Sequence, residues 1–151
     1  MNVLGLYSMD NKTGARKRYP HGRKLDEFAE LFTSTVSKFA GENDCKPSDF
    51  VFVRERGFSR FAAETQTIFR MVGVTDLMIW RLAGKSFDQI APKEVKKFVA
   101  GDGKASKVSV AASLPYYVGD IQYVSDDESD AVAVGIAWLI KNGYEVRGRG
   151  N

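Results

Sequence analysis

The stretch Ser125–Gly143 reads SDDESDAVAVGIAWLIKNG, and its pattern governs how the rest of the chain is interpreted. Acidic residues crowd its beginning, and apolar residues then recur at helical spacing. This spacing predicts a helix that runs to about Asn142, with Gly143 at the C′ position. The acids are Asp126, Asp127, Glu128 and Asp130, and the apolar stripe is Ala131, Val134, Ala137, Trp138 and Ile140.

Asp127 and Asp130 are three residues apart, which places both carboxylates on one face of the first helical turn. Two carboxylates on a rigid helix supply the hard oxygen ligands that a divalent cation prefers. Acids at a helix N-terminus can instead simply cap the helix and offset its dipole. Taken alone, the stretch favours the capping interpretation, so the remaining sequence must decide between the two.

Composition excludes several classes of function. The chain has 151 residues, of which 44% are hydrophobic, enough for one domain with its own core. One cysteine and one histidine argue against disulfides, cysteine-based zinc sites and Ser-His-Asp catalysis. We find neither a membrane-length apolar run nor a signal peptide, and expect a reducing, cytoplasmic setting. The net charge of +3 is compatible with a nucleic-acid partner but is weak support by itself.

The N-terminal part predicts a β-hairpin followed by a helix. Asn2–Met9 and Ala15–Tyr19 are the expected strands, and Asp10–Gly14 has the composition of a turn. The basic second strand is either an exposed edge protected by charge or a DNA-facing surface. An amphipathic helix is then expected over Arg23–Ala40, with Gly41 ending it.

A strand is predicted at Ser48–Glu55, because Phe50–Val53 is continuously apolar, as in buried strands of α/β sheets. Glu55 stands at the C-terminal end of this strand, where open α/β sheets place their ligands. The alternative is an exposed strand-end acid that pairs with Arg54 or Arg56.

The loop after this strand is basic and has an aromatic tip. Phe58 lies between Arg56 and Arg60, an arrangement that suits a base-stacking wedge flanked by phosphate-binding guanidinium groups. The alternative is that Phe58 folds back onto the core.

A long helix is predicted over Phe61–Ala83, ended by Gly84. Gly73 in its middle costs about 1 kcal/mol relative to alanine, which suggests a close backbone approach to the sheet or to a second subunit. The helix is more apolar than one buried face requires, so we expect it at a dimer interface. A short strand follows at Phe87–Ala91.

The remaining elements complete an α/β pattern. Pro92 is expected at the N1 position of a helix, Gly101–Lys104 forms a turn, and Ala105–Leu114 forms another short helix. Pro115–Val124 is predicted to be a loop, and 144–151 a flexible tail. Together these elements predict a mixed sheet flanked by helices.

Three segments resemble RuvC-type Holliday-junction resolvases, also called crossover junction endodeoxyribonucleases, and especially their divergent phage members. Pro92–Val110 is similar to the family's Pro-x-x-Val-Lys…Gly-x-Gly-x-Ala-x-Lys segment. Asp127–Ala131 is similar to the closing Asp-x-x-Asp-Ala motif. Phe52–Glu55, with Phe58 three residues later, is similar to the strand-end glutamate and its following aromatic. The resemblance extends over about 14–143.

The resemblance implies an RNase H-like fold over 1–143, a homodimer, and nicking of four-way DNA junctions that depends on Mg²⁺ or Mn²⁺. It also implies that Glu55, Asp127 and Asp130 bind the metal and that Lys107 takes part in catalysis. Lys96 and Lys107 would contact the scissile phosphate region, and Phe58 would stack on bases. The implied DNA-binding residues are Arg56, Phe58, Arg60, Lys96, Lys97, Lys104 and Lys107.

One departure from the family concerns the first metal ligand. The family begins with a central strand ending in Asp, whereas here Tyr7 follows Val3–Leu6. We therefore expect an N-terminally truncated domain that lacks its first central strand; Asp10 is an alternative ligand, although it lies in a predicted turn. Two other functions stay open. One is a catalytically impaired RNase H-like module that binds branched nucleic acid, and the other is a nuclease acting on flaps or RNA.

Overall fold

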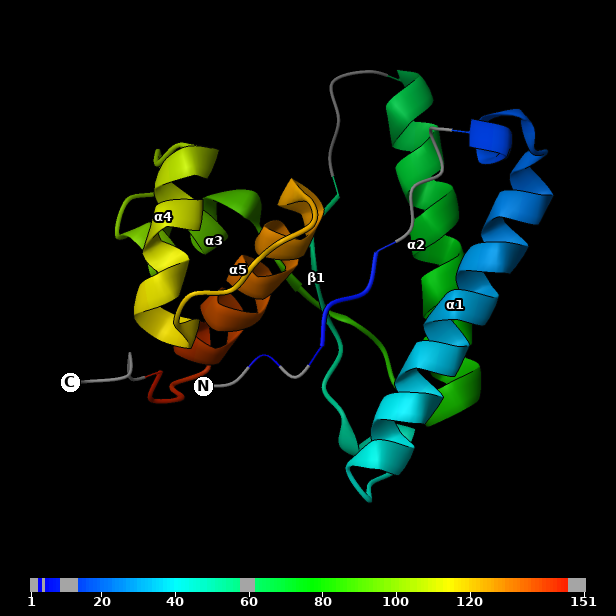
Figure 1. Ribbon diagram of the computed structural model, residues 1–151, viewed down its shortest axis with the longest axis horizontal. Coiled ribbons are helices and arrows are strands. Elements are labelled where there is room, and N and C mark those ends of the chain that lie inside the picture. The colour runs from blue at the N-terminus through cyan, green and yellow to red at the C-terminus, as the bar shows by residue number, and fades with distance from the viewer. Residues whose placement is uncertain (1–2, 4, 9–13, 58–61, 147–151) are drawn as a thin grey trace. The chain divides into compact units, whose positions relative to one another are not determined.

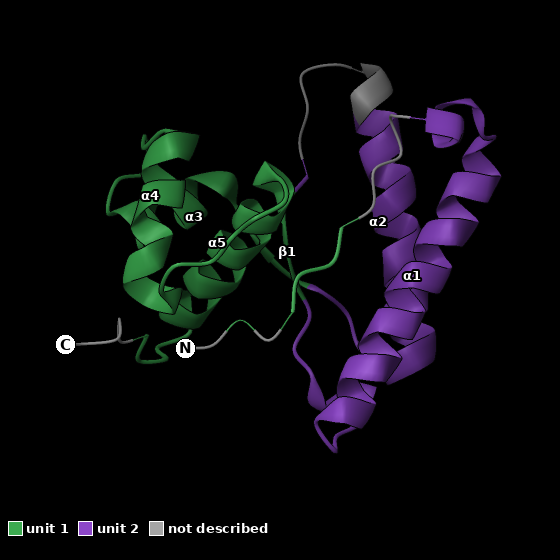
Figure 2. Cartoon of the chain, in the orientation of Figure 1, with its two compact units in different colours: residues 1–8, 53–56, 88–151 green, residues 9–52, 57–87 purple. Residues whose placement is uncertain are grey.

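The structure, a computed structural model, describes residues 3, 5–8, 14–57 and 62–146, without the side chains of 62–64. The chain divides into two compact units, which Figure 2 shows in different colours. Unit 1 contains residues 1–8, 53–56 and 88–151, and unit 2 contains residues 9–52 and 57–87. Among the described residues, no helix is long and apolar enough to cross a membrane.

A short parallel sheet in unit 1 joins β1 (Val53–Glu55) to β2 (Asp88–Ile90). Glu55 pairs with Ile90, whose carbonyl accepts a hydrogen bond of 2.8 Å from the amide of Arg56. These two strands make up the sheet in the described part of the chain. Because parallel strands end at the same edge, side chains at their carboxyl ends meet there.

Three helices complete unit 1: α3 (Pro92–Ala100), α4 (Lys107–Val118) and α5 (Asp126–Lys141) (Figure 1). The prediction that Pro92 opens α3 is confirmed, and Gly101 ends it in the left-handed conformation at a φ of 82°. Aliphatic side chains of the helices and β2 form one core. Its buried members are Ile90, Val95, Val99, Val110, Leu114, Val118, Ala133, Val134, Ile136 and Ala137.

Helix α5 confirms the predicted element, with Asn142 as its C-cap and Gly143 at a φ of 79°. The predicted apolar stripe is partly wrong. Ala131 is exposed, whereas Ala133 and Ile136 are buried. The reason is that α5 packs on α3, α4 and β1 at once, so it buries a wider face than one stripe covers.

Unit 2 consists mainly of α1 (His21–Glu42) packed on α2 (Ala62–Ala83). Helix α2 and its termination at Gly84, which has a φ of 63°, confirm the prediction. A Cβ built on Gly73 would meet no atom within 4 Å, so the predicted close approach to the sheet is wrong. Aromatic rings with centroids about 6 Å apart fill the unit. They are Phe28, Phe32, Phe39, Phe50, Phe52 and Phe87.

The N-terminal hairpin prediction is wrong for the described residues. Residues 5–8 form no strand, and Gly14–Arg18 is a short 3₁₀ helix (η1). The reason is that the basic side chains of this segment find partners on α1. Arg16 forms an ion pair of 3.1 Å with Glu27, and Tyr19 packs under the guanidinium of Arg23. The predicted turn lies mostly outside the described residues, as does Asp10.

Two predicted boundaries around the first helix and strand are also wrong. Helix α1 continues through Gly41 and is capped by Asn43, whose side chain donates a hydrogen bond of 2.8 Å to the carbonyl of Phe39. A single glycine costs too little to stop a helix. The predicted strand at Ser48–Glu55 shrinks to β1, since a 3₁₀ turn (η2) occupies Pro47–Asp49. Its aromatic residues pack within unit 2 instead of extending the strand.

The predicted loop at Pro115–Val124 begins four residues too early, because α4 continues to Val118. Proline removes one helical hydrogen bond, but Leu114 and Val118 on either side of it are buried in the core. Their burial stabilises the last turn of α4 more than the missing bond weakens it.

Candidate active site

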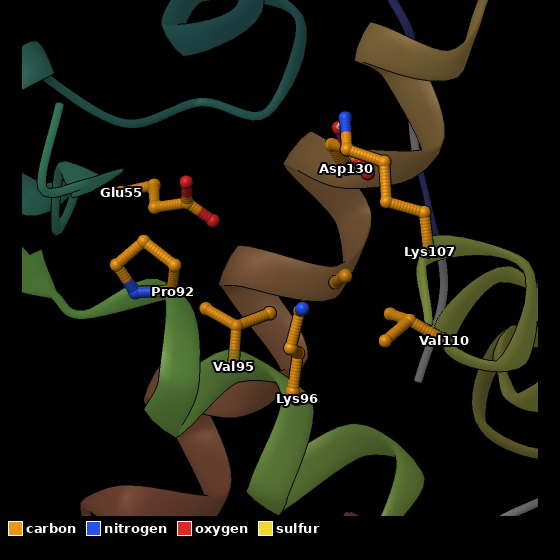
Figure 3. Close-up of a pocket in the computed structure, with 8 residues that line it drawn as sticks. Glu55, Pro92, Val95, Lys96, Lys107, Val110 and Asp130 are labelled. Atoms are coloured by element: carbon orange, nitrogen blue, oxygen red, sulfur yellow. Dashed lines mark hydrogen bonds and ion pairs between the residues drawn. The ribbon is translucent and has the colours of Figure 1, made fainter. Parts of the chain in front are cut away.

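A cavity of about 220 Å³ lies at the end of β1 in unit 1 (Figure 3). Side chains of α3, α4 and α5 form its other walls. Two acids and two amines share the cavity with an apolar lining. The lining residues are Glu55, Pro92, Val95, Lys96, Lys107, Val110, Asp130 and Ala133.

Glu55 is the last residue of β1, as predicted, and Figure 3 shows its carboxylate directed into the cavity. Partial burial raises the pKa of this carboxyl, and the negative charge of Asp130 raises it further. The positive charges of Lys107 and Lys96 act in the opposite direction. Two carboxylates that repel one another in a cavity form a site where a bound cation would be stabilised.

Asp130 is held by Lys107 across the cavity mouth. The Lys107 ammonium donates a hydrogen bond of 2.9 Å to Oδ2 of Asp130. Lys107 is the first residue of α4, and its position is fixed because Ser106 caps that helix by accepting the amide of Ser109 at 3.1 Å. The hydrogen bond to Asp130 and its charge raise the pKa of the Lys107 ammonium, so this group is positively charged at neutral pH.

Lys96 approaches the cavity from α3. It lies one turn after Pro92, so the proline that opens α3 also determines where this lysine stands. The side chain is half-buried, and its amine points toward the two carboxylates in Figure 3. The cavity thus places a strand-end acid, a helical acid and two lysines within reach of a single phosphate-sized group.

Glu128 is a structural acid that the sequence analysis did not distinguish from its neighbours. Only 6% of it is exposed, and its carboxylate accepts the amide of Val124 at 2.8 Å and the hydroxyl of Ser8 at 3.3 Å. It therefore fixes the approach to α5. The Ser125-x-x-Glu128 spacing matches a capping box, but that box does not form: Ser125 makes no side-chain cap hydrogen bond, and Glu128 accepts the amide of Val124 instead.

The structure does not bring all the expected site residues to the cavity. Asp127 is exposed in the first turn of α5 and outside the cavity lining, although its charge still acts on Lys107. Arg56 is exposed just after β1, and Lys97 and Lys104 are exposed on or after α3. Phe58 and Arg60 lie outside the described residues.

The donor set can be compared with the needs of a metal ion. Within the described ranges, no group of three or more His, Cys, Asp or Glu side chains is arranged to hold a cation. The two carboxylates of Glu55 and Asp130 nevertheless suit Mg²⁺, which commonly uses one or two carboxylates, several waters and substrate phosphates. The residues present therefore fit a cation that binds together with a phosphate.

These features define a class of protein by its fold: an α/β domain in which an acid at the end of a strand shares a cavity with an acid and two lysines from the surrounding helices. Two solved structures of RuvC from Thermus thermophilus share this fold, at 18% sequence identity each. The RuvC in complex with a Holliday-junction substrate matches with a TM-score of 0.66 over 86% of this chain and 73% of its own. The second RuvC structure matches with a TM-score of 0.62 over 89% and 77%. The RNase H-like fold predicted from the sequence is thereby confirmed.

The amino-acid sequence is similar to a RuvC from another organism. The crossover junction endodeoxyribonuclease RuvC of Brachyspira hyodysenteriae is 29% identical to this chain over 84 residues, which cover 54% of the chain and 52% of RuvC. No family model matches the chain. The chain spans about half the length of the curated relative it matches. The predicted similarity to RuvC-type resolvases is confirmed in both sequence and fold.

Proposed function

We propose that this chain is a structure-selective DNA endonuclease that resolves four-way junctions by metal-dependent hydrolysis of phosphodiester bonds. The observation that carries the proposal is the convergence of Glu55 and Asp130 with Lys96 and Lys107 at one cavity of a RuvC-like fold. Carboxylates for a cation and lysines for a phosphate are the groups that this chemistry requires. The activity belongs in the cytoplasm, where the DNA substrate lies.

Each residue then takes a role that its chemistry allows. Glu55 and Asp130 hold a divalent cation, either Mg²⁺ or Mn²⁺; Asp127, predicted as a third ligand, would have to reach that cation from outside the cavity lining. When bound, such a cation activates water and stabilises the leaving oxygen. Lys96 and Lys107 offset the negative charge of the phosphate at the cavity.

The basic residues around the cavity bind the arms of the junction. Phe58 stacks on bases near the junction centre, and Arg56 and Arg60 bind the flanking phosphates. Lys97 and Lys104 add further phosphate contacts from exposed positions. Contacts of this kind do not distinguish one base sequence from another. Selection of a junction therefore depends on the shape of the DNA and on the geometry of a dimer.

A homodimer is supported by apolar side chains on α2. Phe69, Leu77 and Trp80 are 62%, 45% and 64% exposed within this chain. Large apolar groups exposed together on one helix are typical of a surface that a partner covers. A second copy of the chain is the partner that a two-fold symmetric junction favours.

A second function is a module that binds branched DNA without cutting it. Its support is that the described residues hold fewer than three candidate ligands in one group. A binding module needs the lysines and the loop around Phe58 but no cation. The two functions therefore differ in one measurable property, which is metal-dependent nicking.

The test compares a synthetic four-way junction with a duplex of equal length and composition. We expect the full chain to bind the junction at least about tenfold more tightly and to nick it when Mg²⁺ is added. Asp130→Asn should stop the nicking and leave junction binding intact. The control variant Asp120→Asn, at an exposed position outside the cavity, should retain both nicking and junction binding. Equal binding to junction and duplex would contradict both functions. Tight junction binding without nicking would favour the binding module, and preferred cutting of a flap or an RNA would indicate another nuclease.

A further inference from the structure

We infer that Lys107 makes cation binding at the cavity depend on DNA. Its ammonium stays bound to the carboxylate of Asp130 until a DNA phosphate binds the ammonium instead. This inference rests on the proposed function and adds a regulatory role for one of its residues. Lys107 acts here as a positioning residue, because it changes which partner Asp130 can bind.

The first step is the position of the ion pair. Lys107 and Asp130 line the cavity that contains Glu55, and both also line a second cavity of about 350 Å³ between α4 and α5. The Lys107 side chain is 75% exposed and the Asp130 side chain 42% exposed. The lysine is therefore held at its tip by one hydrogen bond of 2.9 Å, and it borders a cavity on each side.

The second step is competition for one carboxylate. An ammonium on Oδ2 of Asp130 occupies a lone pair that a cation would use, and its positive charge repels a divalent ion at the same place. Among the described residues, Glu55 is the other carboxylate lining this cavity. The DNA-free protein therefore offers one free carboxylate and one that is already neutralised, which is a poor site for a divalent cation.

The third step is the exchange that DNA makes possible. An exposed ion pair contributes little to stability, so a competing anion can open it readily. A DNA phosphate at the cavity accepts the Lys107 ammonium, and Asp130 is then free to join Glu55 on the cation. The phosphate also supplies oxygen ligands of its own. By thermodynamic reciprocity, cation binding must then tighten DNA binding by the same factor.

As a consequence, the Lys107 side chain weakens the binding of the cation when no DNA is present. A cation loaded only beside a phosphate can activate water only where a substrate is present. The ion pair between Lys141 and Glu94, also 2.9 Å long and also in unit 1, offers a matched control because neither partner lines the cavity.

The experiment measures Mn²⁺ affinity by electron paramagnetic resonance in the full chain, in Lys107→Gln and in Lys141→Gln. Without DNA, we expect Lys107→Gln to bind Mn²⁺ about fivefold more tightly than the unmodified chain, and Lys141→Gln to match it. With a junction whose strands are shown intact on a gel, Mn²⁺ affinity should rise in the unmodified chain and change little in Lys107→Gln. Circular dichroism confirms that both variants fold.

Unchanged or weaker Mn²⁺ binding by DNA-free Lys107→Gln would overturn the inference. That result would leave the proposed function standing, because junction binding and nicking are read separately. Conversely, failure of the unmodified chain to bind junctions would contradict the proposed function, while tighter Mn²⁺ binding by Lys107→Gln would still show that the lysine competes with the cation.

Discussion

The two ends of α5 carry ion pairs of the same length in different surroundings. At the N-terminal end, Asp130 meets Lys107 beside a cavity, and at the C-terminal end Lys141 meets Glu94 on α3. The second pair has additional support, since Glu94 also accepts the amide of Ala91 at 3.0 Å. That backbone hydrogen bond, together with Lys141, lowers the pKa of Glu94.

The acidic side chains near the two ends of α5 differ in how completely they are paired with hydrogen-bond donors and positive charges. The pKa of Glu55 at the cavity is raised by burial and by a like charge, whereas the pKa of Glu94 is lowered by its partners. Acids with complete partners hold α3 and α5 together. Acidic side chains without a full set of partners remain available to bind a ligand, which is typical of functional sites. Four predictions test this difference.

The largest effect is expected from Glu55→Gln. Removing a carboxylate that binds the cation should lower metal-dependent nicking by about 100-fold or more. Single-turnover cutting of a four-way junction measures the loss. Lys141→Gln, at the opposite end of α5, should retain the activity of the unmodified chain. Equal losses in the two variants would show that the ends of the helix do not differ in the way proposed.

Glu128→Ala should destabilise the fold most among changes near the N-terminal end of α5. The substitution removes the buried side chain that accepts the amide of Val124, and losing this hydrogen bond costs about 1–3 kcal/mol. Urea unfolding with Asp120→Asn as the control measures the free energy of unfolding. A stability equal to that of the control would mean that Glu128 has no structural role.

A smaller loss is expected at the C-terminal end from Trp138→Phe. The indole of Trp138 donates a hydrogen bond of 2.9 Å to Asp88 and stacks on Tyr144 with the ring centroids 5.7 Å apart. Phenylalanine keeps an aromatic ring but loses the donor, so the unfolding free energy should fall by about 1 kcal/mol. Nicking should be unaffected. A loss of nicking without a loss of stability would place a functional group at this end of the helix.

The smallest effect is on the pH dependence of stability, and here the substitution should raise the unfolding free energy instead of lowering it. A raised pKa in the folded state means that ionised Glu55 destabilises the fold, and this cost is absent below the ordinary pKa of a glutamate and appears as pH rises through the raised value. Glu55→Gln should therefore be more stable than the unmodified chain at pH 7, by less than about 1 kcal/mol after solvent screening. Thermal unfolding at pH 7 and at about pH 3.5 measures the difference, which should vanish at the lower pH. A variant that is less stable at pH 7 would contradict the unfavourable electrostatics of the cavity.

Local chemistry explains what could be predicted from the sequence. Pro92, Gly101 and Gly143 mark helix ends because their backbone preferences act without help from distant residues. The strand-end position of Glu55 and the helical position of Asp130 followed from hydrophobic periodicity. Their roles in metal binding remain predictions.

Tertiary contacts explain what could not be predicted. The basic residues of Gly14–Arg18 look like an edge strand, but Arg16 pairs with Glu27 of α1, which lies later in the chain. The apolar residues before β1 look like a buried strand, but they join the aromatic cluster of unit 2. In the sequence, Glu128 cannot be told apart from its acidic neighbours. Its structural role follows only from the hydrogen bond that it accepts from a backbone amide. In each case the partner lies outside the window that a local pattern covers.

The discontinuity of unit 1 has a consequence for biosynthesis. Its sheet joins β1 to a strand that follows the whole of α2, and its cavity needs α5, the last helix described. Because a nascent chain emerges from its N-terminus onward, Glu55 leaves the ribosome long before Asp130 is made. The cavity can close only after α5 has been made, so a nascent chain that lacks α5 carries part of the site without the assembled centre.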